Sequence, residues 1–534
     1  MGNGMEEAGV SRELYPWQEE CLERWFANNG RGMVQAATGT GKTLLALEAA
    51  RRLEKKLGEK LRVKVVVPTA ALMRQWDRAL REYLKEFSYA EAEETPGSLR
   101  GRIGLRGGGN QASPDCAYMI YVINSARYEL ARQILKQLRQ GESVLLIADE
   151  CHRYESGQNR LIFEFLPFAE AARGEFFSLG LSATLPSGEA QQYLASALGK
   201  RIYSYGIGQA FVSRTVCPAD IYHIGLELQA EERAEYEELT ERMTYIYGNL
   251  MKACPFLKNM GQKERFQMLE RLSGSRNRKT AQMASMYIRL AYRRKSLICL
   301  ASARTDCACE LVSRLPDMGR IIVFGERIAQ AEKLYQLLRN PYPGRVGRYH
   351  SGMGKQANKN AMERFRNGEL RILIACKAVD EGIDIPAVST GIILSGTSAR
   401  RQRIQRMGRV IRNKEGKARA SLYYLHINDT CEDTCFLPDM GETRLFELEY
   451  ALESGEFRNP DYDTAARVLL KNLQRAGAGA DALKEAERAL RLGIVRGDWM
   501  DDGRELRERK EQAETTGERN YWICMEKLRE IYGA

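Results

Sequence analysis

The sequence predicts an α/β protein with two tandem parallel sheets flanked by helices, a helical insert between them and a helical C-terminal region. Short, continuous Val/Ile/Leu runs alternate with helix-like stretches, which is the pattern of a parallel sheet covered on both faces. This alternation stops after about residue 215 and resumes near residue 313. The chain of 534 residues is also longer than the roughly 250–300 residues at which single cores stop growing.

The first unit, residues 1–215, contains a series of strand-like runs. Helical sequences follow the first three runs, which read "RGMVQAA", "RVKVVVP" and "YMIYVIN", and two further runs read "SVLLIADE" and "FFSLGLSAT". The glycine-rich stretch "GRIGLRGGGN" (Gly101–Asn110) predicts a surface loop inside this unit.

Residues 216–312 have helical spacing without strand runs and carry much of the positive charge. Between Lys252 and Arg304 there are 13 Lys or Arg and 2 Glu, whereas the whole chain has a net charge of +11. A second basic stretch, Arg400–Lys414, contains seven Lys or Arg and no acid. Such concentrated charge predicts a polyanionic partner, with a solvated helical face as the alternative for the first cluster.

Strand and helix alternation resumes over residues 313–430, which predicts the second α/β unit. It includes the runs "RIIVFGE", "LRILIACKAVDEGIDIP", "TGIILSGT" and "ASLYYLHIND". Residues 431–534 are predicted to be mainly helical, with a break at the small residues of Ala476–Leu483.

Composition argues against several classes of protein. The first residues lack the apolar segment of a signal peptide, and no apolar run reaches the roughly 18 residues of a membrane helix. The twelve cysteines are scattered without a CxxC pair, so a reducing cytoplasm is expected rather than a disulfide framework. Only four histidines are present, which argues against a His-rich zinc site.

The segment "AATGTGKT" (Ala36–Thr43) lies between a strand-like run and a strong helix, as a phosphate-binding loop does. Backbone N–H groups of Thr38, Gly39, Thr40 and Gly41 would surround the phosphates of a nucleotide. Lys42 would reach the β- and γ-phosphates, and the Thr43 hydroxyl would bind Mg²⁺. Because Ala36 replaces the first glycine of the full pattern, a chance glycine turn remains the alternative for this motif alone.

The segment "LLIADECHRY" ends an apolar run on Asp149 and Glu150. At a nucleotide site, Asp149 would hold Mg²⁺ through its water shell and Glu150 would activate water. A metal cage built on Cys151 and His152 lacks the further ligands of a tetrahedral site, and nothing in the sequence indicates a lowered thiol pKa. We expect His152 instead to link the hydrolytic site to a neighbouring element.

Together with "TGTGKT" before it and "SAT" (Ser182–Thr184) after it, "DECH" resembles the first motor domain of a superfamily 2 helicase or translocase. In the second unit, "ACKAVDEGIDIP" and "QRMGRVIR" resemble motifs V and VI, and "LYPWQ" resembles the glutamine motif. The resemblance covers about residues 12 to 428 and is nearest in style to excision-repair-type translocases and helicase subunits of restriction and phage-defence systems. It implies two RecA-like domains with ATP and Mg²⁺ bound between them.

The resemblance also implies roles for individual residues. In the second domain, Arg409 and Arg412 would neutralise charge on the γ-phosphate. Gln405, in the same motif "QRMGRVIR", would be a further catalytic residue. Nucleotide contacts would come from Tyr15, Gln18, Gly382 and Asp384, and coupling to nucleic acid from His152, Ser182 and Thr184. The nucleic-acid contacts would come from Pro68, Thr69, Asn124, Ser125, His350, Ser351 and Lys377.

The function expected from these residues is an ATP-dependent helicase or translocase that moves along the phosphate backbone of nucleic acid. DNA is preferred over RNA on resemblance alone. An ATP-switched nucleic-acid sensor or scaffold, and the motor subunit of a restriction or defence nuclease complex, are the alternatives. The tail contains no convincing nuclease cluster, so cleavage would need a protein partner.

Overall fold

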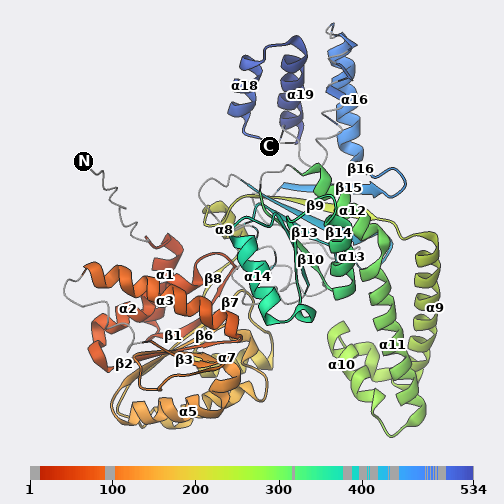
Figure 1. Cartoon of the computed structure of the whole chain (residues 1–534). Coiled ribbons are helices and arrows are strands. Elements are labelled where there is room, and N and C mark those ends of the chain that lie inside the picture. The colour runs from red at the N-terminus through yellow and green to blue at the C-terminus, as the bar shows by residue number, and fades with distance from the viewer. Residues whose placement is uncertain are drawn as a thin grey trace, which may run out of the picture.

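The computed structural model describes residues 13–90, 103–315, 319–376, 388–395, 419–430, 444–475 and 501–532, together with single positions within 406–410, at 432 and within 477–499. In this part of the chain, two sheets of eight strands each form the cores of two α/β domains (Figure 1). The predicted fold class is therefore confirmed. No helix among these residues is long and apolar enough to span a membrane.

The first sheet has the strand order β4-β3-β5-β2-β6-β7-β1-β8, and only its edge pair β3 and β4 is antiparallel. Its strands are β1 Arg31–Ala36, β2 Leu61–Val67, β3 Ile103–Gly107, β4 Asn110–Gln111, β5 Tyr118–Val122, β6 Ser143–Asp149, β7 Phe176–Ser182 and β8 Arg201–Tyr205. The helices of this domain are α1 Pro16–Ala27, α2 Lys42–Leu57, α3 Ala70–Ala90, α5 Ile123–Arg139, α6 Leu166–Ala169 and α7 Glu189–Leu198, with short 3-10 turns at Gly58–Lys60, Cys151–Arg153 and Asn159–Phe163. The glycine-rich stretch predicted as a loop thus forms the β3–β4 hairpin.

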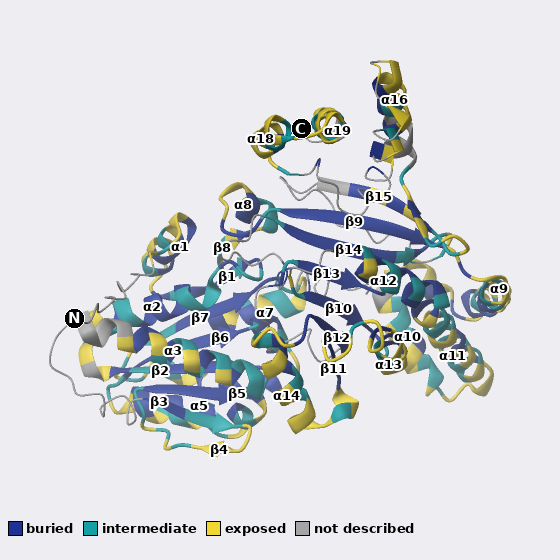
Figure 2. Ribbon diagram, turned by 45° about the horizontal axis from the view of Figure 1, so that its top comes forward, coloured by how far each residue is buried: buried dark blue, intermediate teal, exposed yellow. Residues whose placement is uncertain are grey.

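The second sheet has the order β11-β12-β10-β13-β14-β9-β15-β16. Its strands are β9 Ala219–Leu226, β10 Ile321–Gly325, β11 Val346–Tyr349, β12 Ile372–Cys376, β13 Thr390–Ile393, β14 Ala420–Ile427, β15 Arg444–Ala451 and the antiparallel β16 Glu456–Arg458. The helices α12 Ser302–Arg314, α13 Ile328–Leu338 and α14 Lys355–Arg366, and the 3-10 turn Ser351–Met353, belong to the same domain. Figure 2 shows that the central strands of both sheets are buried, as the continuous apolar runs predict.

The structure differs from the predicted domain boundaries at two places. Residues 216–312 are not entirely helical, because β9 pairs with β14 and β15 inside the second sheet. The C-terminal region likewise begins with β15 and β16 before its helices α16 Pro460–Arg475, α18 Gly503–Gln512 and α19 Thr516–Tyr532. Tyr222 of β9 stacks on Tyr423 at 4.6 Å and on Phe446 at 4.9 Å between ring centroids, partners some 200 residues away that local periodicity does not reveal.

The helical insert is therefore narrower than predicted. It consists of α9 Ala230–Ala253, the 3-10 turn Pro255–Asn259, α10 Gln262–Ser273 and α11 Arg278–Leu300, which pack around a separate apolar cluster. In Figure 1 these helices project from the second domain at the lower right.

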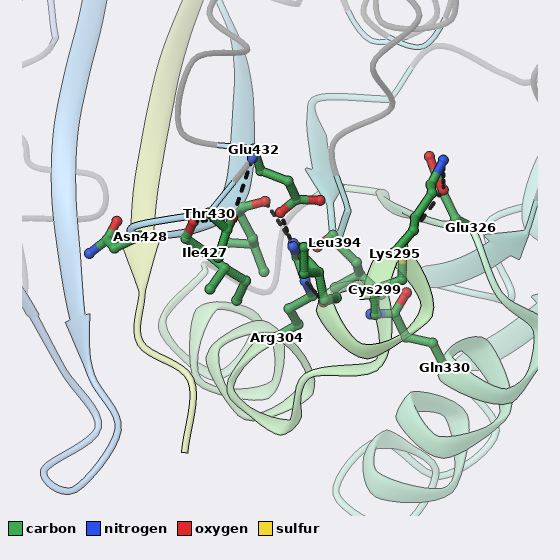
Figure 3. Close-up of polar contacts among 12 residues, drawn as sticks. Lys295, Cys299, Arg304, Glu326, Gln330, Leu394, Ile427, Asn428, Thr430 and Glu432 are labelled. Carbon is green, nitrogen blue, oxygen red and sulfur yellow. Dashed lines mark hydrogen bonds and ion pairs between the residues drawn. The ribbon is translucent and has the colours of Figure 1, made fainter. Parts of the chain in front are cut away.

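The base of the insert is tied to the second domain by buried polar contacts (Figure 3). Fully buried Arg304 donates to the carbonyl oxygens of Ile298 at 2.8 Å and Leu425 at 2.9 Å, and contacts Leu394 O and the Glu432 carboxylate. Beside it, Lys295 of α11 pairs with Glu326, which follows β10, at 3.3 Å. A movement of the second domain is therefore expected to carry the insert with it.

Candidate active site and nucleic-acid face

The loop after β1 has the backbone of a phosphate cradle. Gly39 and Gly41 adopt φ values of 92° and 93°, which L-residues with a side chain rarely adopt. Lys42 begins α2, and its ammonium donates to the carbonyl oxygens of Ala36 at 2.9 Å and Ala37 at 3.1 Å. The curled backbone, the helix N-terminus and this lysine together suit a triphosphate.

Two hydroxyls of the same loop have different environments. The Thr40 hydroxyl donates to Ala37 O at 2.8 Å, which fixes the turn. The Thr38 hydroxyl is buried and has no hydrogen-bond partner among the described residues. Thr43, the candidate Mg²⁺ ligand, occupies the first turn of α2. The loop therefore has polar groups available to a ligand.

The start of α1 lies directly against this loop. Fully buried Gln18 donates from its side-chain amide to Gly41 O at 2.9 Å and accepts from the Tyr15 amide at 2.8 Å. One amide proton and one carbonyl lone pair of Gln18 have no partner among the described residues, and these would suit the edge of a base. Tyr15 is 38% exposed beside it.

Asp149 ends β6, and a tryptophan holds its carboxylate. The indole N–H of Trp76 in α3 donates to Asp149 Oδ2 at 2.8 Å, and the Glu150 amide donates to Oδ1 at 3.0 Å. Burial raises the pKa of the Asp149 carboxyl, whereas the Trp76 bond and the charge of Lys42 oppose that rise. Trp76 is buried, and it also positions the candidate metal ligand.

The residues expected to couple the hydrolytic site to its surroundings lie next to one another. His152 Nδ1 lies 2.8 Å from Ser182 Oγ and 3.3 Å from Glu150 Oε2. Ser182 in turn donates to Thr184 O at 2.6 Å and accepts from the Thr184 amide at 3.2 Å. Glu150 itself has a φ of 51°, in the left-handed region, where a residue with a side chain is strained.

The cysteine between these groups is not placed for reaction. Cys151 is completely buried, and burial raises the pKa of its thiol above the ordinary value. An added Cβ on Gly180 of the neighbouring strand β7 would lie only 3.3 Å from the Cys151 sulfur. Cys151 therefore fills space behind the carboxylates.

The second domain reaches this loop. The backbone of Gly408 lies so close to Thr38 that an added Cβ would stand 2.4 Å from Thr38 Cβ and 2.9 Å from Thr38 O. Val410 packs on Gly391 of β13. The second domain thus contacts the phosphate loop at Gly408. Other expected residues lie outside the described part of the chain, namely Gln405, Arg409, Arg412, Gly382, Asp384 and Lys377.

The candidate nucleic-acid residues of the first domain gather at the carboxyl edge of its sheet. Pro68 and Thr69 precede α3, and Thr69 Oγ1 accepts from the Leu72 amide at 3.2 Å. Asn124 and Ser125 lie in the first turn of α5, where Asn124 is exposed. The β3–β4 turn packs against the first turns of both α3 and α5. A Cβ on Gly107 would meet Ser125 Oγ at 2.6 Å, and one on Gly108 would meet Ala70 Cβ at 2.8 Å.

The two candidates in the second domain differ in accessibility. The His350 ring is buried and directs Nε2 toward Glu332 Oε1 at 2.6 Å, whereas Asn358 contacts its backbone N–H and C=O. Ser351, the next residue, is exposed at the start of a 3-10 turn. A phosphate at this position would therefore meet Ser351 before the imidazole of His350.

Two family models match the chain in separate segments. Residues 11–187 match the res subunit of type III restriction enzymes, and residues 303–414 match the helicase conserved C-terminal domain.

Several similar proteins match over most of this chain. The DNA 3'-5' translocase XPB2 of Sulfurisphaera tokodaii is 24% identical over 411 residues, which cover 76% of this chain and 80% of that protein. The DNA 3'-5' helicase XPB of Kineococcus radiotolerans is 22% identical over 422 residues, covering 78% of this chain and 60% of that protein. Among solved structures, the Hef helicase domain of Pyrococcus furiosus superposes with a TM-score of 0.53 at 17% identity, over 78% of this chain and 96% of that domain.

Proposed function

We propose that this chain, which belongs to superfamily 2 of the helicases and hydrolyses ATP as they do, is a motor that moves along DNA. The single observation that carries the proposal is the meeting of three segments around the phosphate loop. The phosphate loop and Asp149 come from the first domain, and Gly408 of the second domain contacts Thr38. DNA is proposed because two of the similar proteins with broad coverage are named for acting on it.

In the proposed reaction, backbone amides of residues 38–41 and the ammonium of Lys42 bind the phosphates of ATP. Glu150 accepts a proton from the attacking water. Thr43 and Asp149 would hold Mg²⁺, which would neutralise charge on the phosphates. Gln18 and Tyr15 would contact adenine.

Closure of the cleft would complete this site. Arg409 and Arg412 follow Gly408 in the sequence, and from there they would meet the γ-phosphate. Arginine fingers typically contribute about 10³- to 10⁵-fold in turnover, so hydrolysis would depend on closure. Gln405, Gly382 and Asp384 would complete the nucleotide contacts from the second domain.

Movement would follow if closure changes the grip on nucleic acid. Pro68, Thr69, Asn124 and Ser125 lie on the first domain, and His350, Ser351 and Lys377 belong to the second. Contacts of this kind go to phosphates and position the strand without reading its sequence. His152, Ser182 and Thr184 would connect this face to Glu150.

We also propose that the insert binds duplex or forked DNA. Seven of its basic side chains are exposed and have no ion pair among the described residues, namely Lys252, Lys258, Arg271, Arg276, Arg278, Lys279 and Arg289. The insert also exposes aromatic rings, with Tyr245 at 74% and Tyr292 at 53% exposure. Because Arg304 and Lys295 tie the insert to the second domain, DNA held there would move with that domain (Figure 3).

The decisive experiment is phosphate release with single- and double-stranded DNA and RNA, followed by strand displacement with 3′ and 5′ tails. Stimulation by DNA is expected. ATP binding without stimulated turnover would refute the motor and support an ATP-switched sensor. DNA cleavage that appears only with a protein partner would support the motor subunit of a nuclease complex.

The role of the insert is tested separately by charge reversal. The triple change Arg276→Glu, Arg278→Glu and Lys279→Glu is expected to weaken DNA binding and flatten its salt dependence. The slope of log K against log salt should change by up to about 2.7, at about 0.9 for each phosphate that the variant no longer neutralises. A matched control reverses Lys471, Arg475 and Arg507, which are exposed on α16 and α18. Equal effects of both triple variants would exclude a specific insert surface.

A further inference from the structure

Tyr205, the last residue of β8, contacts three functional segments at once. Its carbonyl oxygen accepts from the Ala37 amide at 3.0 Å, at the base of the phosphate loop. Its ring stacks on Trp17 of α1, with 4.6 Å between ring centroids and an interplanar angle of 11°. Its hydroxyl is bonded to Thr215 Oγ1 at 2.8 Å and to Ser213 Oγ.

Each contact belongs to a different part of the proposed motor. Ala37, whose N–H binds Tyr205, also accepts hydrogen bonds on its carbonyl oxygen from Lys42 and Thr40. Ala37 therefore anchors the phosphate loop. Trp17 immediately precedes Gln18, the expected adenine contact. Ser213 and Thr215 lie in the segment between β8 of the first sheet and β9 of the second.

The segment between the sheets is held in a defined conformation. It contains the helix α8 Ile207–Val212, and Arg214 follows with a φ of 54° in the left-handed region. Thr215 is 2% exposed, and its amide donates to Ala210 O at 3.0 Å. Because the peptides on both sides of Ser213 are fixed, a shift of the Tyr205 hydroxyl would be passed to the start of β9.

The other side of Tyr205 is equally constrained. Trp17 is buried, and its indole N–H has no hydrogen-bond partner among the described residues. The stacking on Tyr205 therefore fixes the ring of Trp17 where a hydrogen bond does not. A shift of α1 would move the Tyr205 ring directly, since packed aromatic faces leave little free space.

We infer that Tyr205 is a positioning residue that transmits the nucleotide state of the first domain to the linker that orients the second domain. This inference rests on the proposed function and adds a residue that touches neither ATP nor DNA. Its ring would shift with α1 and its carbonyl with the phosphate loop. Its hydroxyl would pass this shift to Ser213 and Thr215, in the segment between β8 and β9.

The test is Tyr205→Phe, which removes the hydroxyl and keeps the ring and the backbone bond to Ala37. We expect the KM for ATP and the unstimulated rate to stay within about two-fold of wild type. The DNA-stimulated kcat is expected to fall about 10-fold, which corresponds to about 1.4 kcal/mol. Thr215→Val removes one of the two hydrogen bonds of the Tyr205 hydroxyl and should lower the DNA-stimulated kcat in the same direction. The double variant should be no worse than Tyr205→Phe, because Tyr205→Phe already removes the bond to Thr215.

Tyr203→Phe is the matched control. Tyr203 lies two residues earlier on β8, and its hydroxyl donates to Glu20 at 2.6 Å on the surface. This control should leave stimulation unchanged. If Tyr205→Phe behaves like Tyr203→Phe, or lowers only the melting temperature, the inference is wrong.

A distance measurement separates this inference from the proposed function. Fluorescent labels on the two domains should report closure when a non-hydrolysable ATP analogue binds, and Tyr205→Phe should reduce that closure at saturating analogue. A wild-type chain that closes without DNA-stimulated hydrolysis would refute the motor. Reduced closure in Tyr205→Phe would then still support the role of Tyr205. A variant that closes as fully as wild type, or a wild type that binds the analogue and does not close, would refute the role of Tyr205.

Discussion

Replacing Trp76 by Phe tests whether the buried indole keeps Asp149 ionised. The indole nitrogen lies 2.8 Å from Asp149 Oδ2, and Asp149 is only 7% exposed. A hydrogen bond to a charged group contributes about 1.5–3 kcal/mol, and one pKa unit corresponds to about 1.36 kcal/mol. Loss of this bond should therefore raise the pKa of Asp149 by about 1–2 units above its already raised value.

The sign of the effect on activity follows from the proposed role of Asp149. Only the ionised carboxylate can hold Mg²⁺, so the acidic limb of the ATPase pH profile should move to higher pH by about 1–2 units. On that limb the variant should be roughly 10- to 100-fold slower than wild type. The deficit should shrink as pH or the Mg²⁺ concentration rises.

Trp25→Phe is the matched control for this variant. Trp25 is also fully buried in the first domain, and its indole donates to the Ser178 carbonyl oxygen at 2.9 Å, away from the carboxylates. Both variants should lose similar stability. A Trp76→Phe profile that keeps the wild-type acidic limb, or a deficit that is constant with pH and equal to that of Trp25→Phe, would refute this reasoning.

Three further substitutions test the same site. Glu150→Gln should retain ATP binding and lose hydrolysis, and normal phosphate release would reject Glu150 as the base. Gly408→Ala should lower kcat about 5- to 100-fold, because the new methyl group would overlap Thr38 at a cost of about 1–3 kcal/mol, whereas Gly248→Ala has open space in α9 and should be neutral. Asp149→Asn should be inactive yet melt at a higher temperature than wild type at neutral pH without Mg²⁺. A carboxyl with a raised folded-state pKa costs stability above its unfolded pKa of about 3.9, so calorimetry should show this gain vanish in acid.

The local parts of the site could be predicted from the sequence because each depends on a few neighbouring residues. A glycine pair before a lysine at a helix start, and two carboxylates at the end of an apolar strand, predict a phosphate loop and a metal-binding edge wherever the strands lie. The structure places Lys42 and Asp149 at the carboxyl ends of β1 and β6, separated in the sheet only by β7. The tandem parallel sheets were predictable for the same reason, since buried strands are continuous apolar runs.

The remaining features depend on pairings between distant segments, which local patterns do not encode. The Trp76–Asp149 bond joins residues 73 apart, and Trp76 has the spacing of an ordinary core residue. Strand β9 pairs with β14 and β15, which come about 200 residues later in the chain, so its place in the second sheet depends on those distant strands. The contacts of Tyr205 with Trp17 and Thr215, and of Gly408 with Thr38, arise where folded elements meet. The residue types of the candidate phosphate and metal site were thus readable along the chain, whereas the residues that join the two domains were decided by tertiary packing.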